Sequence, residues 1–276
     1  MTDFYKYHAL GNDYIVIDPS KISFPIKLTE DNIKLICHRN LGIGSDGILY
    51  GPIMRDEKMH FQIFNPDGSE AEKSGNGIRI FAQYIWDVGY SNEKQISLET
   101  KGGTVIVESL NQEKNLMKVN MGKFYFPDNI INKELQIADK FFLITCVNIG
   151  NPHCVIICDD ISPEMALKYG PLLEVHPMFP NRTNVQFVKV IDKNKIQIEI
   201  WERGAGYTSA SGSSSTAAAI AAHTHGLVGI DLTVSMPGGS VEINIEDNHA
   251  YLTGPVSRVM SGNIASDLKK ILIKTH

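Results

Sequence analysis

The feature that most constrains what this chain can fold into is a set of four short segments that occurs twice, in the same order. The second copies follow the first by 139, 138, 137 and 136 residues. The matched pairs are "LGNDYIVID" with "IGNPHCVIICDD", "SDGILYG" with "TNVQFVKV", "SGNG" with "SGSS", and "KGGTVIVE" with "PGGSVEIN". Because a nearly constant offset through four pairs is hard to obtain by chance, we predict a duplicated unit of about 130 residues.

Each copy is expected to be an antiparallel or mixed sheet around one helix. The segments "QISLET", "GTVIVES" and "LMKVNM" alternate apolar and polar residues, which is typical of strands covered on one face. The helix after Ser74 is apolar almost all round, which favours a position inside the sheet. The sequence therefore predicts an α+β fold of two pseudo-symmetric, β-barrel-like domains at 1–125 and 126–262. A tail at 263–276 is expected to pack back on the first domain or at a dimer interface.

Composition excludes several kinds of partner. The chain has 276 residues and a formal net charge of −5, so no basic surface for nucleic acid or an anionic membrane is expected. No apolar run approaches the roughly 18 residues that span a bilayer. The first residues lack the pattern of a signal peptide. We therefore expect a cytoplasmic protein that acts on a small molecule.

The four cysteines are expected to pack in the core. None of them forms a CxxC pair, and buried cysteine behaves as a small hydrophobic residue. No metal site is predicted from them. They are Cys37, Cys146, Cys154 and Cys158.

The two matched turns, at Ser74 and Ser211, precede apolar helices, the second expected over 215–226. The first N–H groups of a helix have no acceptor within the helix, and with the helix dipole they attract a carboxylate or phosphate. Two such starts facing one ligand between the copies would hold a single anion. Each serine taken alone reads more simply as an N-cap, but the duplication favours a binding site.

Polar residues gather near these turns. Asparagine is unusual in apolar strands unless paired donors and acceptors are needed. The adjacent charges of "WERGAG" can recognise an ammonium and a carboxylate, which points to an amino acid; a surface salt bridge is the simpler alternative. The residues are Asn12, Asn65, Asn76, Asn151, His153, Asn184, Glu202 and Arg203.

Seven segments resemble the signatures of the diaminopimelate epimerase family. They lie in the family's order between His8 and about Gly254: "HALGNDYIVID", "FNPDGSEAEKSGNGIR", "VNMG", "IGNPHCV", "TNVQF", "ERGAGYTSASGSS" and "MPGGSVEI". The resemblance implies two similar domains, each a β-barrel-like sheet around a central helix, with the site between them. It also implies epimerisation of LL-diaminopimelate to the meso form without a cofactor, by a protein that is commonly a homodimer.

The same resemblance implies roles for individual residues. One residue from each half would flank the α-carbon, at Ser74 and Ser211, where the family has cysteine. His153 and Glu202 would support the reacting centre. The α-carboxylate would be held by the N–H groups of Gly75, Asn76, Gly212 and Ser213, and the distal end of the substrate by Asn65, Asn151, Asn184 and Arg203, with Asn12 nearby.

The serines at both cysteine positions are the main departure from the family. A thiol has an ordinary pKa near 8.5 that a helix N-terminus lowers further, whereas a serine hydroxyl ionises far less readily. Losing proton transfer at one base costs roughly 10²–10⁴-fold in rate. Gly47, Tyr207 and Ser214 stand where the family usually has glutamine, glutamate and glycine, which favours natural variation over a deliberate double substitution.

Three functions follow from this pattern, and we predict the first. It is an amino-acid epimerase or racemase that uses another base, with Lys73, His153, Glu202 and Tyr207 as candidates; a merely solvated Lys73 is the simpler reading. The second is a lyase, dehydratase or isomerase on a hydroxy, unsaturated or amino acid, in which a serine holds the departing hydroxyl. The third is a catalytically silent protein that binds an amino acid.

Overall fold

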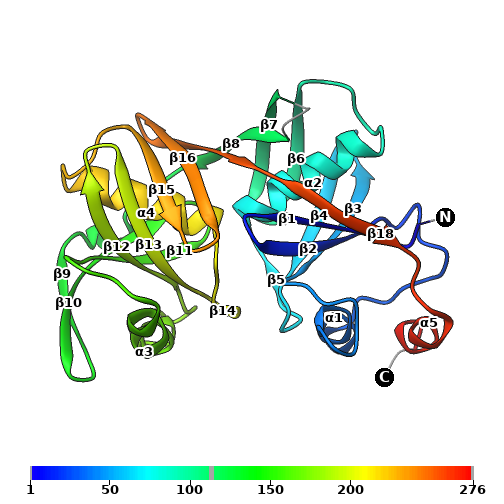
Figure 1. Cartoon of the computed structure of the whole chain (residues 1–276), viewed down its shortest axis with the longest axis horizontal. Helices are drawn as coiled ribbons and strands as arrows, with labels where there is room; N and C mark the ends of the chain where they lie inside the picture. Colours follow the sequence, from blue (N-terminus) through cyan, green and yellow to red (C-terminus); the bar gives the residue numbers. More distant parts are fainter. Residues whose placement is uncertain (1, 112–114, 275–276) are drawn as a thin grey trace. The chain divides into compact units, whose positions relative to one another are not determined.

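The computed structural model describes residues 2–111 and 115–274, which form two compact units (Figure 1). Unit 1 is Met1–Met117 with Pro255–His276, and unit 2 is Lys118–Gly254. The chain passes between the units in strands β8 (Leu116–Lys123) and β17 (His249–Pro255), which pair with each other. The domain limits expected at 125/126 and 262/263 refer to the duplicated segments of the sequence. The limits of the compact units need not coincide with them, so the expected limits stay predictions.

Unit 1 is a mixed sheet. Strand β1 pairs antiparallel with β2, β2 parallel with β3, and β3 antiparallel with β4. Strand β4 pairs antiparallel with β5 and parallel with β6, β6 pairs antiparallel with β7, and β18 lies antiparallel along β1. The bounds are β1 Phe4–Ala9, β2 Asn12–Ile17, β3 Ile48–Arg55, β4 Lys58–Phe64, β5 Glu70–Ala71, β6 Gln95–Thr100, β7 Gly103–Asn111 and β18 Ser257–Gly262.

Unit 2 repeats the arrangement pairing by pairing. Strands β10 to β16 pair in the same order and with the same directions as β1 to β7, and β9 lies along β10 as β18 lies along β1. The predicted duplication is therefore confirmed in the topology. The bounds are β9 Lys133–Ile137, β10 Lys140–Asn148, β11 Pro152–Ile157, β12 Asn184–Asp192, β13 Lys195–Glu202, β14 Gly206–Tyr207, β15 Asp231–Met236 and β16 Gly239–Glu246, with a 3₁₀ turn at Pro127–Asn129.

A helix lies inside each sheet. Helix α2 (Gly75–Asp87) contacts β1, β2, β3, β6 and β7, and helix α4 (Gly212–Thr224) contacts strands of unit 2 from β10 to β16. Residues 75–85 and 212–222 are buried on every side, as their apolar and small side chains predict. The pairings of the described strands leave each sheet open, so each is barrel-like only in wrapping its helix.

Among the described residues, helices α1 (Glu30–Cys37), α5 (Ser266–Leu272) and α3 (Pro163–Glu174) cover the outer faces. In unit 1, α1 and α5 lie on the side of the strands away from α2 (Figure 1), and β2 is buried at all six positions because both of its faces are covered. Helix α3 packs on β12 and β13 of unit 2. Within the described ranges no helix has the length and apolar composition needed to cross a bilayer.

The cysteines belong to these cores, as expected. Cys37 lies in the cluster under α1, and Cys146 and Cys154 lie in the cluster under α3, where the half-buried Cys158 packs at the edge. Burial raises the pKa of Cys37 and of Cys146 to about 11. Their thiols are therefore neutral and serve as packing groups.

The end of the chain is fastened to its beginning within unit 1. The Asp3 carboxylate accepts from Ser23 N (3.0 Å), Ser23 Oγ (2.7 Å) and Ile264 N (2.9 Å), and it pairs with Lys269 Nζ at 2.7 Å. Leu272 is fully buried beside α1. Helix α5 is therefore held by both an ion pair to a buried carboxylate and an apolar contact.

Candidate active site

The two helix starts that the sequence singled out have the same geometry. Ser74 precedes α2 with φ −141° and ψ 116°, and its Oγ accepts from Gly77 N at 3.0 Å. Ser211 precedes α4 with φ −145° and ψ 122°, and its Oγ accepts from Ser214 N at 3.4 Å. Both serines are therefore N-caps, and α4 begins at Gly212, earlier than the expected 215. Each cap still has hydrogen-bonding capacity, since a hydroxyl has one donor and two acceptor sites.

Ser74 has a second contact that the sequence did not indicate. The hydroxyl of Tyr14, on β2, lies 3.1 Å from Ser74 Oγ. The Tyr14 side chain is 6% exposed, so its ring is fixed by packing while its hydroxyl points at the helix start. A phenol is thus the acid–base group in contact with Ser74.

Ser211 has a corresponding partner in unit 2. Its Oγ donates to Glu202 Oε2 at 2.9 Å, and Glu202 ends strand β13. Ser211 itself is 4% exposed. The two helix starts therefore share one arrangement, in which a serine hydroxyl caps the helix and is hydrogen-bonded to a side chain that can exchange a proton.

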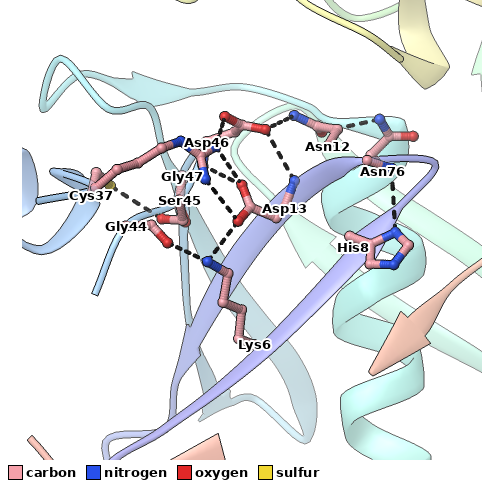
Figure 2. A network of polar contacts seen from close by, with 12 residues as sticks. Lys6, His8, Asn12, Asp13, Cys37, Gly44, Ser45, Asp46, Gly47 and Asn76 are labelled. Carbon is pink, nitrogen blue, oxygen red and sulfur yellow. Dashed lines mark hydrogen bonds and ion pairs between the residues drawn. The ribbon is translucent and has the colours of Figure 1, made fainter. Parts of the chain in front are cut away.

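A directed chain of hydrogen bonds leads away from the start of α2. Arg79 Nη2 donates to Asn76 Oδ1 (2.8 Å), Asn76 Nδ2 donates to Asn12 Oδ1 (3.0 Å), and Asn12 Nδ2 donates to Asp46 Oδ2 (3.2 Å). Figure 2 shows the asparagines lying side by side with Asp46 at the end of the chain. With a cation at one end and a carboxylate at the other, both amide orientations are fixed.

The carboxylate end of this chain belongs to a charged cluster (Figure 2). Asp13 Oδ1 accepts from Asp46 N at 3.0 Å, Asp46 Oδ2 accepts from Asp13 N at 3.1 Å, and Arg39 Nη2 donates to both carboxylates. Lys6 Nζ lies 2.8 Å from Asp13 Oδ2. Burial alone would raise the pKa of Asp13, but Arg39 and Lys6 lower it; burial and the charge on Asp13 raise the pKa of Asp46. The cluster joins the start of β2 to the loop before β3.

In unit 2 the predicted polar residues form a buried group behind Ser211. His153 Nε2 lies 3.0 Å from Asn151 Oδ1, and Asn151 Nδ2 lies 3.5 Å from Ser213 Oγ. Because an amide oxygen only accepts, the neutral ring carries its proton on Nε2. Burial lowers the pKa of His153 to about 3, so the ring is uncharged near neutral pH.

The remaining predicted residues have more local contacts. Asn184 accepts from Arg203 N (3.0 Å) and donates to Pro152 O (2.9 Å), which places Arg203 at the end of β13. Asn65 Nδ2 donates to Ser69 Oγ at 3.0 Å within the turn after β4. Asn151, Asn184 and Arg203 thus lie together in unit 2 around β11 to β13, and Asn12 and Asn76 lie together in unit 1.

The surroundings of two candidate bases, Lys73 and Tyr207, decide whether each carries its proton at neutral pH. Lys73 is not solvated: it is 8% exposed, and burial lowers its pKa to about 8. Tyr207 donates to Glu199 Oε2 at 2.7 Å, and burial with this carboxylate raises its pKa to about 12. Lys73 is therefore partly neutral at physiological pH, whereas Tyr207 is held protonated.

Lys73→Met is expected to raise the free energy of unfolding at pH 7 by about 2 kcal/mol, because the folded protein no longer buries an ammonium. The folded pKa of about 8 lies below the ordinary value of 10.5, so the unaltered protein should gain stability between pH 8 and pH 10.5. The variant should lack this rise. Urea unfolding at pH 7 and pH 10 measures both, with the exposed Lys101→Met as control; the same rise in Lys73→Met would show that this ammonium is not buried.

Sequence reasoning missed Tyr14, Asp13 and Asp46 as parts of the site. In the sequence, Tyr14 is one residue of the strand segment "NDYIVI". The available signal was Gly47, because a Cβ there would lie 2.6 Å from Tyr14 Cε1. A glycine in place of the family's usual glutamine therefore marks the space that the Tyr14 ring fills.

A known family model matches the chain in two segments. The family model described as Diaminopimelate epimerase matches residues 4–127 and 145–259. A protein of Nostoc sp. (strain PCC 7120) named Diaminopimelate epimerase 2 is 50% identical over 277 residues, covering 96% of each chain. The Diaminopimelate epimerase of Carboxydothermus hydrogenoformans is 39% identical over 273 residues, covering 94% of this chain and 98% of the relative.

Solved structures of more distant proteins share the fold. A hydroxyproline epimerase from Agrobacterium vitis has a TM-score of 0.73 at 14% identity and covers 96% of this chain and 92% of its own. A methylitaconate-delta-isomerase has a TM-score of 0.66 at 11% identity, covering 99% and 97%. At these identities the likeness extends to the fold alone.

Proposed function

Because the chain belongs to the diaminopimelate epimerase family, a family of isomerases, we propose that it inverts the α-carbon of diaminopimelate or of a close relative with a charged group at each end. The observation that carries this proposal is that each helix-capping serine is hydrogen-bonded to a proton-exchanging side chain, Tyr14 for Ser74 and Glu202 for Ser211. Epimerisation needs one group to remove the α-proton and another to return a proton on the opposite face.

On the resemblance to the family, we propose that helix-start N–H groups bind the α-carboxylate, those of Gly75 and Asn76 in α2 and those of Gly212 and Ser213 in α4. These groups carry the positive end of the helix dipole, and they also stabilise the negative charge that spreads into the carboxylate when the α-proton leaves. This stabilisation requires no added cofactor. The distal end of the substrate is recognised by Asn12, Asn65, Asn151, Asn184 and Arg203.

Glu202 is the base in unit 2. Its carboxylate accepts a hydrogen bond from Ser211 Oγ in the resting protein, so a proton can pass from the substrate through the Ser211 hydroxyl to the carboxylate. The α C–H bond breaks, an O–H bond forms, and the electron pair stays on the α-carbon. His153 is a poor base because its pKa is about 3, so its part is to orient Asn151 near Ser213.

The test is to incubate the protein with LL-diaminopimelate in D₂O and to follow the α-proton by NMR, with binding measured by calorimetry. We expect the α-proton signal to disappear and the meso form to accumulate. Binding without exchange over days would contradict the proposal and favour a silent binding protein. Release of water or ammonia from a β-hydroxy amino acid, without exchange on diaminopimelate, would favour a lyase instead.

We also propose a homodimer that works in the cytoplasm, on the resemblance to the family. Light scattering on the purified protein tests the dimer. A mass near the 30.6 kDa of one chain at micromolar concentration would contradict it.

A further inference from the structure

Gly47 and Tyr14 form a matched pair beside Ser74. A Cβ on residue 47 would lie 2.6 Å from Tyr14 Cε1, 3.0 Å from Tyr14 Cδ1 and 2.6 Å from Phe64 O. Any side chain at residue 47 would therefore clash with both the Phe64 carbonyl and the Tyr14 ring, and the ring would have to move. The ring position depends on glycine at residue 47.

The pair brings the phenol of Tyr14 to the hydroxyl of Ser74 at the start of α2. Tyr14 lies on β2, whose six residues are all buried, and Ser74 caps α2, which packs on β2. The two oxygens are 3.1 Å apart, and Gly77 N–H already occupies one acceptor site of Ser74. When Tyr14 donates to the second acceptor site, the proton of Ser74 points elsewhere, available to a ligand.

We propose that Tyr14 supplies protons to the substrate through Ser74, as a relay that stands in for the missing thiol of unit 1. The relay rests on the proposed function. Ser74 Oγ–H gives its proton to the α-carbanion, forming the new C–H bond, while Ser74 Oγ takes the proton of Tyr14, which becomes a phenolate. Glu202 holds the proton removed from the substrate, and exchange with solvent returns the phenolate and the carboxylic acid to their starting states. The reverse reaction uses the same steps in reverse order.

The relay solves the problem that serine poses. A serine hydroxyl alone cannot exchange protons at neutral pH, but a phenol has an ordinary pKa of about 10, within two units of a thiol. The forward reaction starts from a neutral phenol and an ionised carboxylate. Tyr14 is thus a positioning and proton-supplying residue that acts through Ser74.

Tyr14→Phe is the direct test, because it removes one oxygen and keeps the buried ring. In the D₂O experiment we expect accumulation of the meso form to fall about 10²-fold, with binding of diaminopimelate unchanged, because proton delivery to the second face needs Tyr14 whereas proton removal by Glu202 does not. Tyr50→Phe is the matched control: Tyr50 is half-buried on β3 and packs with the cluster under α1. An unchanged rate of meso-form accumulation in Tyr14→Phe would overturn the relay and leave the proposed function standing. No exchange by the unaltered protein would overturn both.

A second comparison separates a relay from a structural role. Ser74→Cys restores a thiol that needs no relay, so in this background Tyr14→Phe should change the rate by no more than about twofold. An equal loss in the serine and cysteine backgrounds would mean that Tyr14 only supports the fold, and would overturn the relay. A Ser74→Cys protein without any exchange would also count against it.

Discussion

Glu202→Gln is expected to lower the rate of α-proton exchange by about 10³-fold while leaving the affinity for diaminopimelate nearly unchanged. Glutamine has the shape of glutamate, and its amide oxygen can still accept from Ser211 Oγ, so the helix cap should keep its 2.9 Å contact. An amide cannot hold the α-proton, however. The change therefore removes the base and keeps the binding geometry.

The measurement is exchange in D₂O followed by NMR, with calorimetry for affinity. Glu246→Gln is the matched control, because Glu246 ends β16 of the same unit and is exposed. A rate within a few fold of the unaltered protein would exclude Glu202 as the base. Lys73, buried beside Ser74 with a pKa of about 8, would then be the next candidate.

Asp3→Asn is expected to cost about 2–3 kcal/mol of the free energy of unfolding of unit 1. The Asp3 side chain is fully buried, pairs with Lys269 and accepts from Ser23 and Ile264, so the amide would leave the half-buried Lys269 ammonium without its counter-charge. Helix α5 should detach first. Urea unfolding measures the loss, with the exposed Asp267→Asn on the same helix as control. A loss below about 1 kcal/mol would show that the ion pair does not hold α5.

The same carboxylate gives an acid limit to stability. Burial alone would raise the pKa of Asp3, but the bonds from Lys269, Ser23 and Ile264 lower it to about 2, below the ordinary 3.8. A lowered folded pKa stabilises the protein fully above pH 4, and this contribution of about 2 kcal/mol is lost as the pH falls towards 2. Asp3→Asn should lack this part of the pH dependence. If Asp3→Asn loses stability over the same acid pH range and by the same amount as the unaltered protein, other carboxylates cause that loss.

Features encoded in short segments could be predicted from the sequence. The duplication, the alternating strands and the helices after Ser74 and Ser211 follow from residue patterns within a few positions of each other. The sequence pattern places the start of α4 too late, because Ser213 and Ser214 read as part of a turn. In the structure both serines are buried in the first turn of the helix, and Ser214 Oγ accepts from Gln186 Nε2 at 3.0 Å. This contact satisfies the polar group that made the segment look irregular.

Contacts between distant segments could not be predicted in this way. Tyr14 and Ser74 are 60 residues apart, and nothing within the strand "NDYIVI" tells which neighbour its hydroxyl meets. Gly47 stood out as a departure from the family, but its meaning is a clash in space that only the fold reveals. Likewise, Asp13 and Asp46 are adjacent because Lys6 and Arg39 neutralise them, which requires four segments to be placed together.

The route of the chain between the units has a consequence for its synthesis. Strand β18 and helix α5, which complete unit 1, leave the ribosome after unit 2, whereas their partner β1 leaves before it. Domains usually fold from the N-terminus as the chain emerges, at roughly 5–20 residues per second. Here unit 2, Lys118–Gly254, is translated in full before unit 1 can close. During that interval the edge of β1 is unpaired and open to association with other chains. Unit 2 can therefore complete its fold before unit 1. Translation that stops before β18 should leave the edge of β1 exposed.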